Sequence, residues 1–169
     1  MTVISVHVVV LAAGKGTRMK SSRPKGLHEV HGRSMLARVL AAASTVRPSS
    51  VTLVLGHQAE DVVARFADTS VQFVIQEPQR GTGHALQQAL PRLAGATGDL
   101  LLLYGDVPLL SPATLQALLA RHRDDAAALT VLTAVVEQPF GYGRIVREGG
   151  EVARIVEERD ASEHERAIA

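Results

Sequence analysis

Short apolar runs alternate with longer amphipathic segments along most of the chain. The first run, over residues 6–11, is continuous and rich in β-branched residues, which predicts a strand buried on both faces. Four similar runs predict further strands, over residues 51–55, 71–75, 100–104 and 129–136. The intervening segments predict helices, over residues 35–43, 59–66, 83–93 and 112–122. This alternation is typical of a Rossmann-like α/β domain, a right-handed and mostly parallel sheet with helices on both faces.

The rhythm changes near the C-terminus. Two short runs, over residues 144–147 and 152–157, flank Gly149-Gly150 and predict a β-hairpin. The pattern Ser-Glu-His-Glu over residues 162–165 predicts a helix that begins with a capping box. The sequence stops within about one turn, and an isolated helix this short is marginal. We therefore expect residues 1–169 to be the N-terminal part of one domain, with a fold that is incomplete at the C-terminus.

Composition narrows the class of protein. The chain of 169 residues has a net charge of +1 and 3% aromatic residues, so neither a basic field nor stacking platforms indicate nucleic-acid binding. It contains no cysteine, which excludes disulfides, thiolate metal sites and a cysteine nucleophile. No apolar run approaches the roughly 18 residues that span a bilayer, and the N-terminus lacks the features of a signal peptide. We expect a cytoplasmic protein with no nucleic-acid or membrane partner.

A glycine-rich, cationic loop follows the first predicted strand, and it contains all three lysines of the chain. The loop lacks the spacing of a Walker A motif, and Met19 stands where the dinucleotide-binding fingerprint needs its third glycine. Backbone N–H groups at Gly14 and Gly16 could still cradle triphosphate oxygens, while Arg18 and Lys25 neutralise charge that develops during transfer. The alternative is an ordinary strand-to-helix turn with solvated cations.

Asp106 follows the strand predicted over residues 100–104. A single carboxylate here, with Gly105 leaving room for a ligand, suits Mg²⁺, which commonly takes one or two carboxylates plus phosphate oxygens. The alternative is a turn or helix-capping aspartate, which is common before proline.

Gln76 ends the third predicted strand, and Gly81-Thr82-Gly83 opens the next helix. An amide side chain can pair with a pyrimidine edge through one donor and one acceptor, and the glycines would let the base approach the backbone. The alternative is a turn with a threonine helix cap. Because ligands of such sheets bind beyond the carboxyl ends of the strands, we expect this segment, the cationic loop and Asp106 to converge on one edge.

The histidines show no metal-ligand spacing on one helix. We interpret them as structural or surface residues, namely His28, His31, His57, His84 and His122. The GxSxG pattern of a serine nucleophile is absent as well.

Several short motifs follow one another along the chain. They are Leu-Ala-Ala-Gly-Lys-Gly-Thr-Arg-Met at 11–19, Pro24-Lys25, Gln76, Gly-Thr-Gly-His-Ala at 81–85, Tyr-Gly-Asp-Val-Pro at 104–108, Gly-Tyr-Gly-Arg-Ile at 141–145 and Ile-Val-Glu at 155–157. This series resembles the N-acetylglucosamine-1-phosphate uridylyltransferase family, the pyrophosphorylase half of the bifunctional bacterial enzyme GlmU. The first motif alone marks many sugar-nucleotide transferases, whereas the series at 81–85, 104–108 and 141–145 is much more specific to this branch.

The resemblance implies a nucleotide-diphospho-sugar transferase type of fold and a role for each motif. Three residues are implied in catalysis, with the last also a Mg²⁺ ligand: Arg18, Lys25 and Asp106. The residues implied in substrate binding contact uridine and phosphates (Leu11, Ala12, Ala13, Gly14 and Lys25), uracil (Gln76, Gly81 and Thr82), ribose and metal (Tyr104, Gly105 and Asp106) or the amino sugar (Gly143 and Glu157).

The implied reaction is Mg²⁺-dependent uridylyl transfer from UTP to N-acetylglucosamine 1-phosphate. It gives UDP-N-acetylglucosamine, a precursor for peptidoglycan and lipopolysaccharide, and pyrophosphate. The family continues with asparagines that hold the sugar and complete the Mg²⁺ site, whereas this chain contains no asparagine. The β-helix half that carries acetyl transfer and builds a trimer is also absent, so no acetyltransferase activity is expected, and a homo-oligomer is expected only of a full-length parent.

Three alternatives remain open at this point. A related nucleotidyltransferase would use another base, such as CTP or GTP, or another acceptor. A non-catalytic nucleotide-binding module would bind UTP but release no pyrophosphate. A plain dinucleotide-binding domain is disfavoured because the third glycine is absent.

Overall fold

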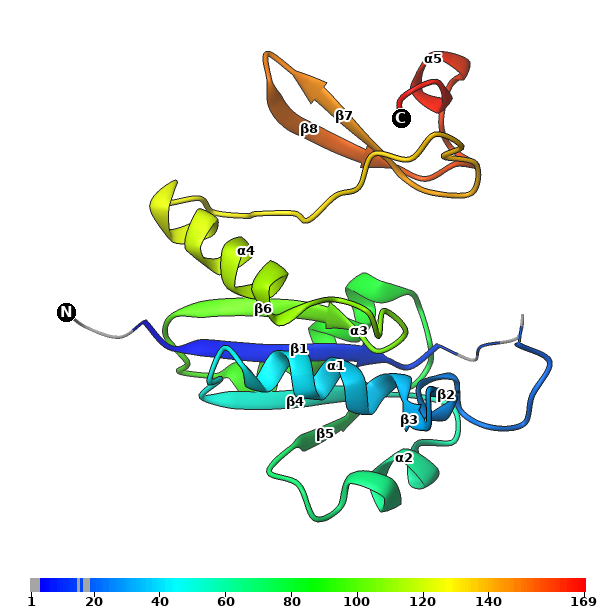
Figure 1. Ribbon diagram of the computed structural model, residues 1–169, viewed down its shortest axis with the longest axis vertical. Helices are drawn as coiled ribbons and strands as arrows, with labels where there is room; N and C mark the ends of the chain where they lie inside the picture. The colour runs from blue at the N-terminus through cyan, green and yellow to red at the C-terminus, as the bar shows by residue number, and fades with distance from the viewer. Residues whose placement is uncertain (1–3, 15, 17–18) are drawn as a thin grey trace. The chain divides into compact units, whose positions relative to one another are not determined.

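The computed structural model describes residues 4–14, 16 and 19–169 (Figure 1). The chain divides into two compact units, Met1–Ala127 and Ala128–Ala169. Each unit has its own sheet, and each is described by itself below. Within the described part of the chain, no helix is both long enough and apolar enough to cross a membrane.

The first unit is built on a four-stranded parallel sheet with the order β5-β4-β1-β6. Its strands are β1 (Val6–Ala12), β4 (Ser50–Leu55), β5 (Gln72–Ile75) and β6 (Asp99–Tyr104). Val8 of β1 lies opposite Val51 on one side and Leu101 on the other. The first four strands predicted from the sequence are therefore confirmed, and all of them run in the same direction.

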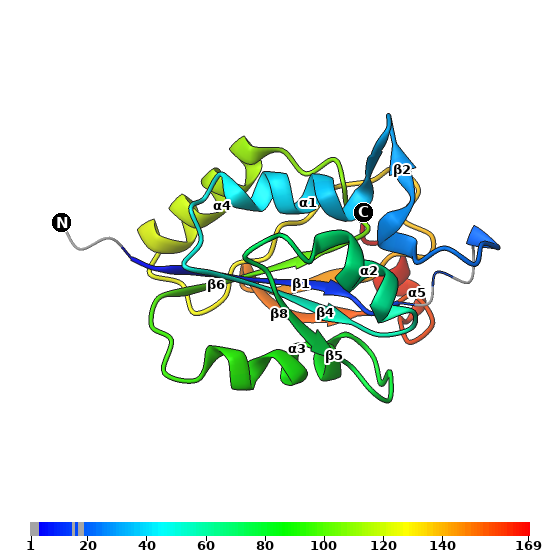
Figure 2. The same ribbon diagram turned by 90° about the horizontal axis from the view of Figure 1, so that it is seen from below.

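Helices cover both faces of this sheet. Figures 1 and 2 show α1 (Met35–Ser44) and α4 (Pro112–Asp124) on one face and α3 (Thr82–Ala89) on the other. The described residues of this unit also form α2 (Ala59–Phe66), and a small antiparallel pair joins β2 (Glu29–Val30) to β3 (Arg33–Ser34). Two short 3₁₀ turns lie at Lys25–Leu27 and Leu90–Leu93.

The core explains why β1 is apolar throughout. Val8 and Val10 belong to the cluster that contains Leu36 of α1, whereas Val9 packs in a separate cluster with Ala85 of α3. Alternate side chains of a strand point to opposite faces, so a strand covered on both sides needs apolar residues at every position. The three valines have no exposed surface, which confirms the expected burial on both faces.

Two helix boundaries follow from local chemistry. The Ser111 hydroxyl accepts the Thr114 N–H at 3.1 Å and Pro112 occupies the first helical position, as the sequence predicts for the start of α4. The helix predicted over residues 83–93 instead ends as an α-helix at Ala89 and continues as a 3₁₀ turn. Pro91 accounts for the change, because it has no N–H to donate to the preceding turn.

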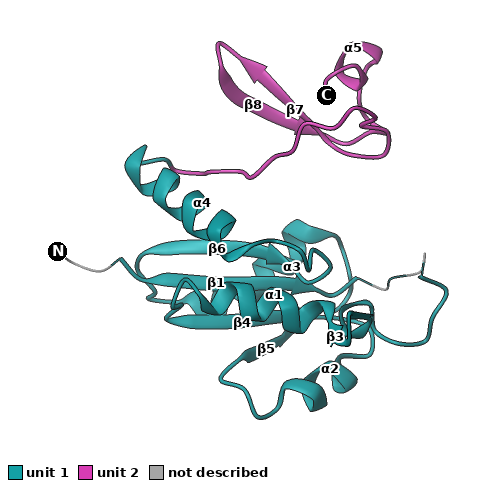
Figure 3. Cartoon of the chain, in the orientation of Figure 1, with its two compact units in different colours: residues 1–127 teal, residues 128–169 magenta. Residues whose placement is uncertain are grey.

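The second unit contains an antiparallel hairpin of β7 (Arg144–Glu148) and β8 (Glu151–Val156), followed by α5 (Glu163–Arg166) (Figure 3). Gly149 and Gly150 both have positive φ, 58° and 92°, which suits a tight hairpin turn. The Arg144 side chain is 3% exposed, and its guanidinium donates to a Glu158 carboxylate oxygen at 2.7 Å and to carbonyls of Tyr142 and Arg166. The predicted hairpin and capped helix are confirmed.

Residues 129–136 were expected to form a fifth strand, and this prediction was wrong. No sheet of the described residues includes them, and Leu129 and Val135 are 78% and 86% exposed. An apolar, β-branched run indicates only that extended backbone is favourable. A strand also needs a neighbouring strand to complete its hydrogen bonds, and the pattern of one segment does not show whether that neighbour is present.

Glu165 offers a direct test of the capping box in the second unit. Its carboxylate accepts hydrogen bonds from the Ser162 backbone N–H, the Ser162 hydroxyl and Arg154, in that order of importance, which lowers its pKa from 4.5 to about 2. Because the folded-state pKa is depressed, the carboxylate stabilises the helix above about pH 4.5 and loses this effect as the pH falls towards 2. NMR titration of Glu165 should therefore give a midpoint near 2. A midpoint at its usual value would mean that the capping box does not form in solution.

Candidate functional site

A pocket of about 370 Å³ opens at the carboxyl edge of the parallel sheet. It is lined by residues from the ends of three strands and from the first turns of α3. Eleven residues that the sequence assigns to the site line it: Leu11, Ala12, Ala13, Gly14, Lys25, Gln76, Gly81, Thr82, Tyr104, Gly105 and Asp106. The structure thus brings together three segments that lie far apart in the sequence, as the parallel topology predicts.

The ends of β1 and β6 are joined at the base of the pocket. The Gly105 N–H donates to the Leu11 carbonyl at 2.9 Å. A Cβ at Gly105 would lie 3.1 Å from Ala12 Cβ and 3.3 Å from Leu36 Cδ1. The sequence suggests that Gly105 leaves room for a ligand, but the atoms that a side chain here would meet belong to the protein. Gly105 therefore allows the two strand ends to pack closely.

Lys25 and Asp106 form an ion pair on the wall of the pocket, between Nζ and Oδ2. Both side chains are partly exposed, 36% and 38%. Lys25 is placed by a 3₁₀ turn and by Gly16, at which a Cβ would lie 2.9 Å from Lys25 Cβ. Gly16 also has a φ of 59°, so both its conformation and its surroundings favour glycine.

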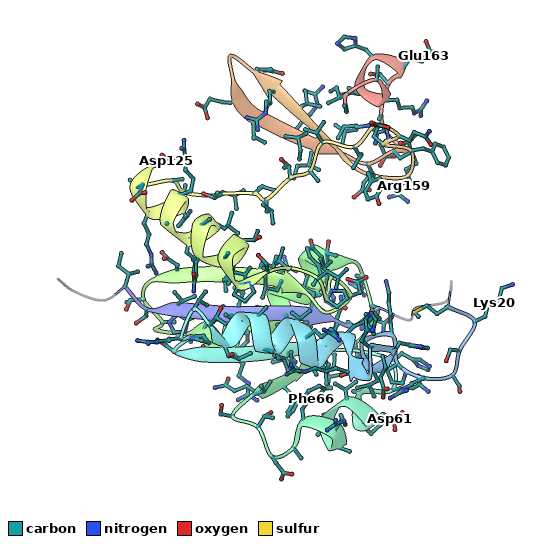
Figure 4. All side chains as sticks on the ribbon, in the orientation of Figure 1. Lys20, Asp61, Phe66, Asp125, Arg159 and Glu163 are labelled. Atoms are coloured by element: carbon teal, nitrogen blue, oxygen red, sulfur yellow. The ribbon has the colours of Figure 1, made fainter. Side chains whose placement is uncertain are left out.

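The cationic loop is only partly described. Arg18, which the sequence assigns to catalysis, lies outside the described residues. Lys20 follows the undescribed stretch and extends outwards on the side where the parallel strands end (Figure 4). Lys25 is the only cation among the described residues that line the pocket.

Asp106 is the only carboxylate among the described residues of the pocket. The described part of the chain contains no cluster of three or more acidic or histidine side chains that could enclose a metal by itself. A cation here would share Asp106 with oxygens supplied by a substrate. This donor set fits Mg²⁺, which often retains waters and phosphate oxygens in its coordination shell.

Gln76 also lines the pocket, and both its backbone and its side chain are hydrogen-bonded. Its side chain is only 4% exposed, and its backbone N–H donates to the Leu55 carbonyl at 2.7 Å. The side-chain Nε2 donates to the Gly81 carbonyl at 2.9 Å and lies 3.1 Å from Nδ1 of His84. Gln88 lies on the other side of the imidazole, 3.2 Å from its Nε2.

Gly16, which the sequence marks as a candidate phosphate-cradling glycine, also lines the pocket, whereas three lining residues were not assigned to the site from the sequence: Gly26, Gln79 and Ala85. Gln79 lies between two assigned segments, so its place in the same loop was a usable signal. Gly56 explains how it fits, because a Cβ there would lie 2.2 Å from Gln79 Nε2 and 2.7 Å from the Ala13 carbonyl oxygen.

Gly143 and Glu157 belong to the second unit, where they flank the hairpin. A Cβ at Gly143 would be in ordinary contact with Ile155 Cγ2, at 3.5 Å. Their expected contact with an amino sugar stays a prediction.

The parallel sheet and the glycine-rich, carboxylate-bearing pocket at its carboxyl edge define an α/β nucleotidyltransferase domain. Comparison with known proteins agrees, because residues 8–167 match the family described as the MobA-like NTP transferase domain. The chain belongs to this family.

Curated relatives share about half of their residues with this chain. The bifunctional protein GlmU of Trichlorobacter lovleyi is 54% identical over 162 residues, which cover 95% of this chain and 35% of the relative. The GlmU of Stutzerimonas stutzeri is 51% identical over 166 residues, 98% of this chain and 36% of the relative. The chain therefore spans about a third of the length of these relatives.

Solved structures share the fold. A Bacillus anthracis protein described as a glucose-1-phosphate thymidylyltransferase superposes with a TM-score of 0.76 over 91% of this chain and 65% of its own, at 17% identity. A manganese complex of Rv0371C from Mycobacterium tuberculosis superposes with a TM-score of 0.58 over 72% of this chain and 59% of its own, at 30% identity.

Proposed function

We propose that this chain is the nucleotide-binding part of an enzyme that transfers a uridylyl group from UTP to N-acetylglucosamine 1-phosphate. The observation that carries the proposal is the pocket in which the glycine-rich loop, the Gln76–Thr82 segment and Asp106 meet. The identity of about 50% to bifunctional GlmU proteins supports this substrate pair. The product would be UDP-N-acetylglucosamine, made in the cytoplasm for cell-wall precursors.

The reaction needs positioning and charge stabilisation rather than a covalent nucleophile. A phosphate oxygen of the sugar phosphate attacks the α-phosphorus of UTP, and the bond from that phosphorus to the bridging oxygen of pyrophosphate breaks. Backbone N–H groups of the loop around Gly14 would hold the phosphates. Arg18 and Lys25 would stabilise the charge that builds up on the departing pyrophosphate.

The opposite wall would hold the nucleoside. Gln76, Gly81 and Thr82 would read the uracil, and Tyr104 with Gly105 would lie beside the ribose. Gly143 and Glu157 of the second unit would contact the amino sugar.

Asp106 would hold Mg²⁺ together with phosphate oxygens of the substrate. A bound Mg²⁺ supplies positive charge at the phosphates and fixes their geometry. Lys25 pairs with the same carboxylate, and entry of a triphosphate gives its ammonium group other oxygens to contact. The positive charge of Lys25 would thus still have negatively charged partners if Asp106 bound a cation instead.

Thermal unfolding with saturating nucleotide and Mg²⁺ tests the proposed function. UTP at about 100 times its dissociation constant would stabilise the folded state by about 2.7 kcal/mol, which raises the midpoint by several degrees for a domain of this size. CTP, ATP, GTP and NAD at matched concentrations should give smaller shifts. An equal shift with CTP would reject uracil reading, and a larger shift with NAD would favour a dinucleotide-binding domain.

A further inference from the structure

Gln76 belongs to a continuous series of polar contacts that extends from the pocket to residues of α3 that do not line it. It runs from the Gly81 carbonyl to Nε2 of Gln76, then to Nδ1 of His84, and from Nε2 of His84 to the amide of Gln88. The distances are 2.9, 3.1 and 3.2 Å. His84 and Gln88 are partly buried on α3, and His84 does not line the pocket. The His84 side chain therefore reaches the pocket through Gln76, the pocket residue that it contacts.

The chain of contacts fixes where each proton lies. A backbone carbonyl can only accept, so Gln76 must direct its NH₂ group at Gly81. The second hydrogen of the same nitrogen then faces Nδ1 of His84, which must present a lone pair. A neutral imidazole with a bare Nδ1 carries its proton on Nε2. The Gln88 amide nitrogen faces this N–H in the structure, and interchanging the nitrogen and oxygen of that amide, two groups of equal size, would let the oxygen accept it.

This arrangement leaves Gln76 with one group to offer a ligand. Both hydrogens of its amide are used, and no described residue donates a hydrogen bond to its carbonyl oxygen. Gln76 lines the pocket, so we infer that Oε1 is the atom of this amide left to accept a hydrogen bond from a ligand there. The pairing through one donor and one acceptor, which the sequence suggests for this amide, is therefore not available in this arrangement.

The start of α3 provides the complementary donors. Gly81 precedes the helix, and no side chain of the described residues caps it, so the first N–H groups of the helix are free of a side-chain acceptor. A backbone donor beside the Oε1 acceptor matches a carbonyl next to a ring N–H. Uracil presents that pair at O4 and N3–H. Cytosine presents an amino group and an unprotonated N3 instead. The lone pair of that N3 would face the lone pair of Oε1 and repel it.

We propose that His84 is a specificity-determining positioning residue. By accepting a hydrogen bond from Gln76, it locks the amide with Oε1 towards the base and so selects a pyrimidine with a protonated N3 over cytosine. The inference rests on the proposed function, since it takes the pocket on this wall to hold the base of a pyrimidine nucleotide. It replaces the interpretation of His84 as only a structural or surface residue.

Binding of UTP and CTP to two variants of His84 tests the role. His84→Leu removes one of the two acceptors that orient the amide, and UTP affinity should fall about tenfold, together with the preference for UTP over CTP, because only the Gly81 carbonyl then opposes rotation of the amide. His84→Asn can place an amide oxygen where Nδ1 lies and should retain most of the preference. Isothermal titration with Mg²⁺ present gives both dissociation constants. A purely structural role would lower the unfolding midpoint and leave the UTP to CTP ratio unchanged.

The outcomes separate the two proposals. If the unmodified chain binds UTP and CTP equally, the uracil-reading function fails. If it prefers UTP and His84→Leu keeps the same ratio, only the role of His84 is overturned. NMR of the His84 ring nitrogens in the unmodified chain is a second test that needs no variant to fold: the proton should be on Nε2, and a proton on Nδ1 of the neutral ring would contradict the proposal.

Discussion

Asp106→Asn should abolish most of the Mg²⁺-dependent function of the pocket. Asparagine keeps the size of the side chain but removes the charge that would hold the cation and that pairs with Lys25. Loss of this electrostatic group should lower pyrophosphate release from UTP and N-acetylglucosamine 1-phosphate by roughly 10²- to 10³-fold. The second readout is the gain in UTP affinity on adding Mg²⁺, measured by titration calorimetry, which should nearly vanish.

The control for this prediction is Asp61→Asn on α2, an exposed carboxylate outside the pocket (Figure 4). It makes the same change of charge and should leave both readouts unchanged. Asp106→Asn should also leave folding nearly intact, because an exposed ion pair contributes about 1 kcal/mol or less. An Asp106→Asn variant with the Mg²⁺ response of the unmodified chain would show that the cation is held elsewhere.

Gly98→Ala should cause a large loss of stability in the first unit. Gly98 precedes β6 with a φ of 111°, and a Cβ there would lie 2.2 Å from the Ser5 carbonyl oxygen. The obstacle is backbone, and the same carbonyl accepts the Asp99 N–H at 2.9 Å. Strain at such a φ alone costs about 1–3 kcal/mol, and displacing the start of the β1–β6 ladder adds to it. We expect a total of at least about 3 kcal/mol and a midpoint lowered on the order of 10 °C.

Gly95→Ala separates the two causes. Gly95 lies in the same loop with a φ of 76°, but a Cβ there meets nothing within 4 Å. This variant carries conformational strain without the clash, so it should cost about 1–2 kcal/mol. Thermal and urea unfolding of both variants measures the difference. Equal losses would mean that the loop moves away from Ser5 without resistance.

Much of the fold could be predicted because the decisive signals are local. The continuous run over residues 6–11 indicates a doubly covered strand, and the Ser111-Pro112 pair specifies a helix start without any knowledge of the rest of the molecule. The run over residues 129–136 shows where this reasoning ends. Its residues favour extended backbone, but a β-strand also needs a neighbouring strand to hydrogen-bond with. Whether such a neighbour is present depends on the whole fold.

For the candidate site, the meeting of the strand ends could be predicted from the sequence, but the side-chain contacts could not. The parallel topology was enough to predict that the residues after β1, β5 and β6 would meet, because that edge is shared by construction of the sheet. Side-chain relationships could not be predicted in this way. The contact of His84 with Gln76 depends on the orientation of α3. Gly105 must be small because a side chain there would crowd against Leu36 of α1. Arg18 lies outside the described residues, and its role rests on the sequence.

The ion pair between Lys25 and Asp106 has a consequence for the order of events at the pocket. With its two charges compensated, the pair offers little net attraction to a lone cation or to a lone anion. A cation that arrived alone would leave the ammonium group of Lys25 without its partner, and a triphosphate that arrived alone would leave the carboxylate of Asp106 in the same state. A magnesium–nucleotide complex would provide a cation for Asp106 and phosphate oxygens for Lys25 at the same time. If Asp106 holds the metal and Lys25 the phosphates, as proposed, the pair would favour joint binding of metal and nucleotide over binding of either component alone.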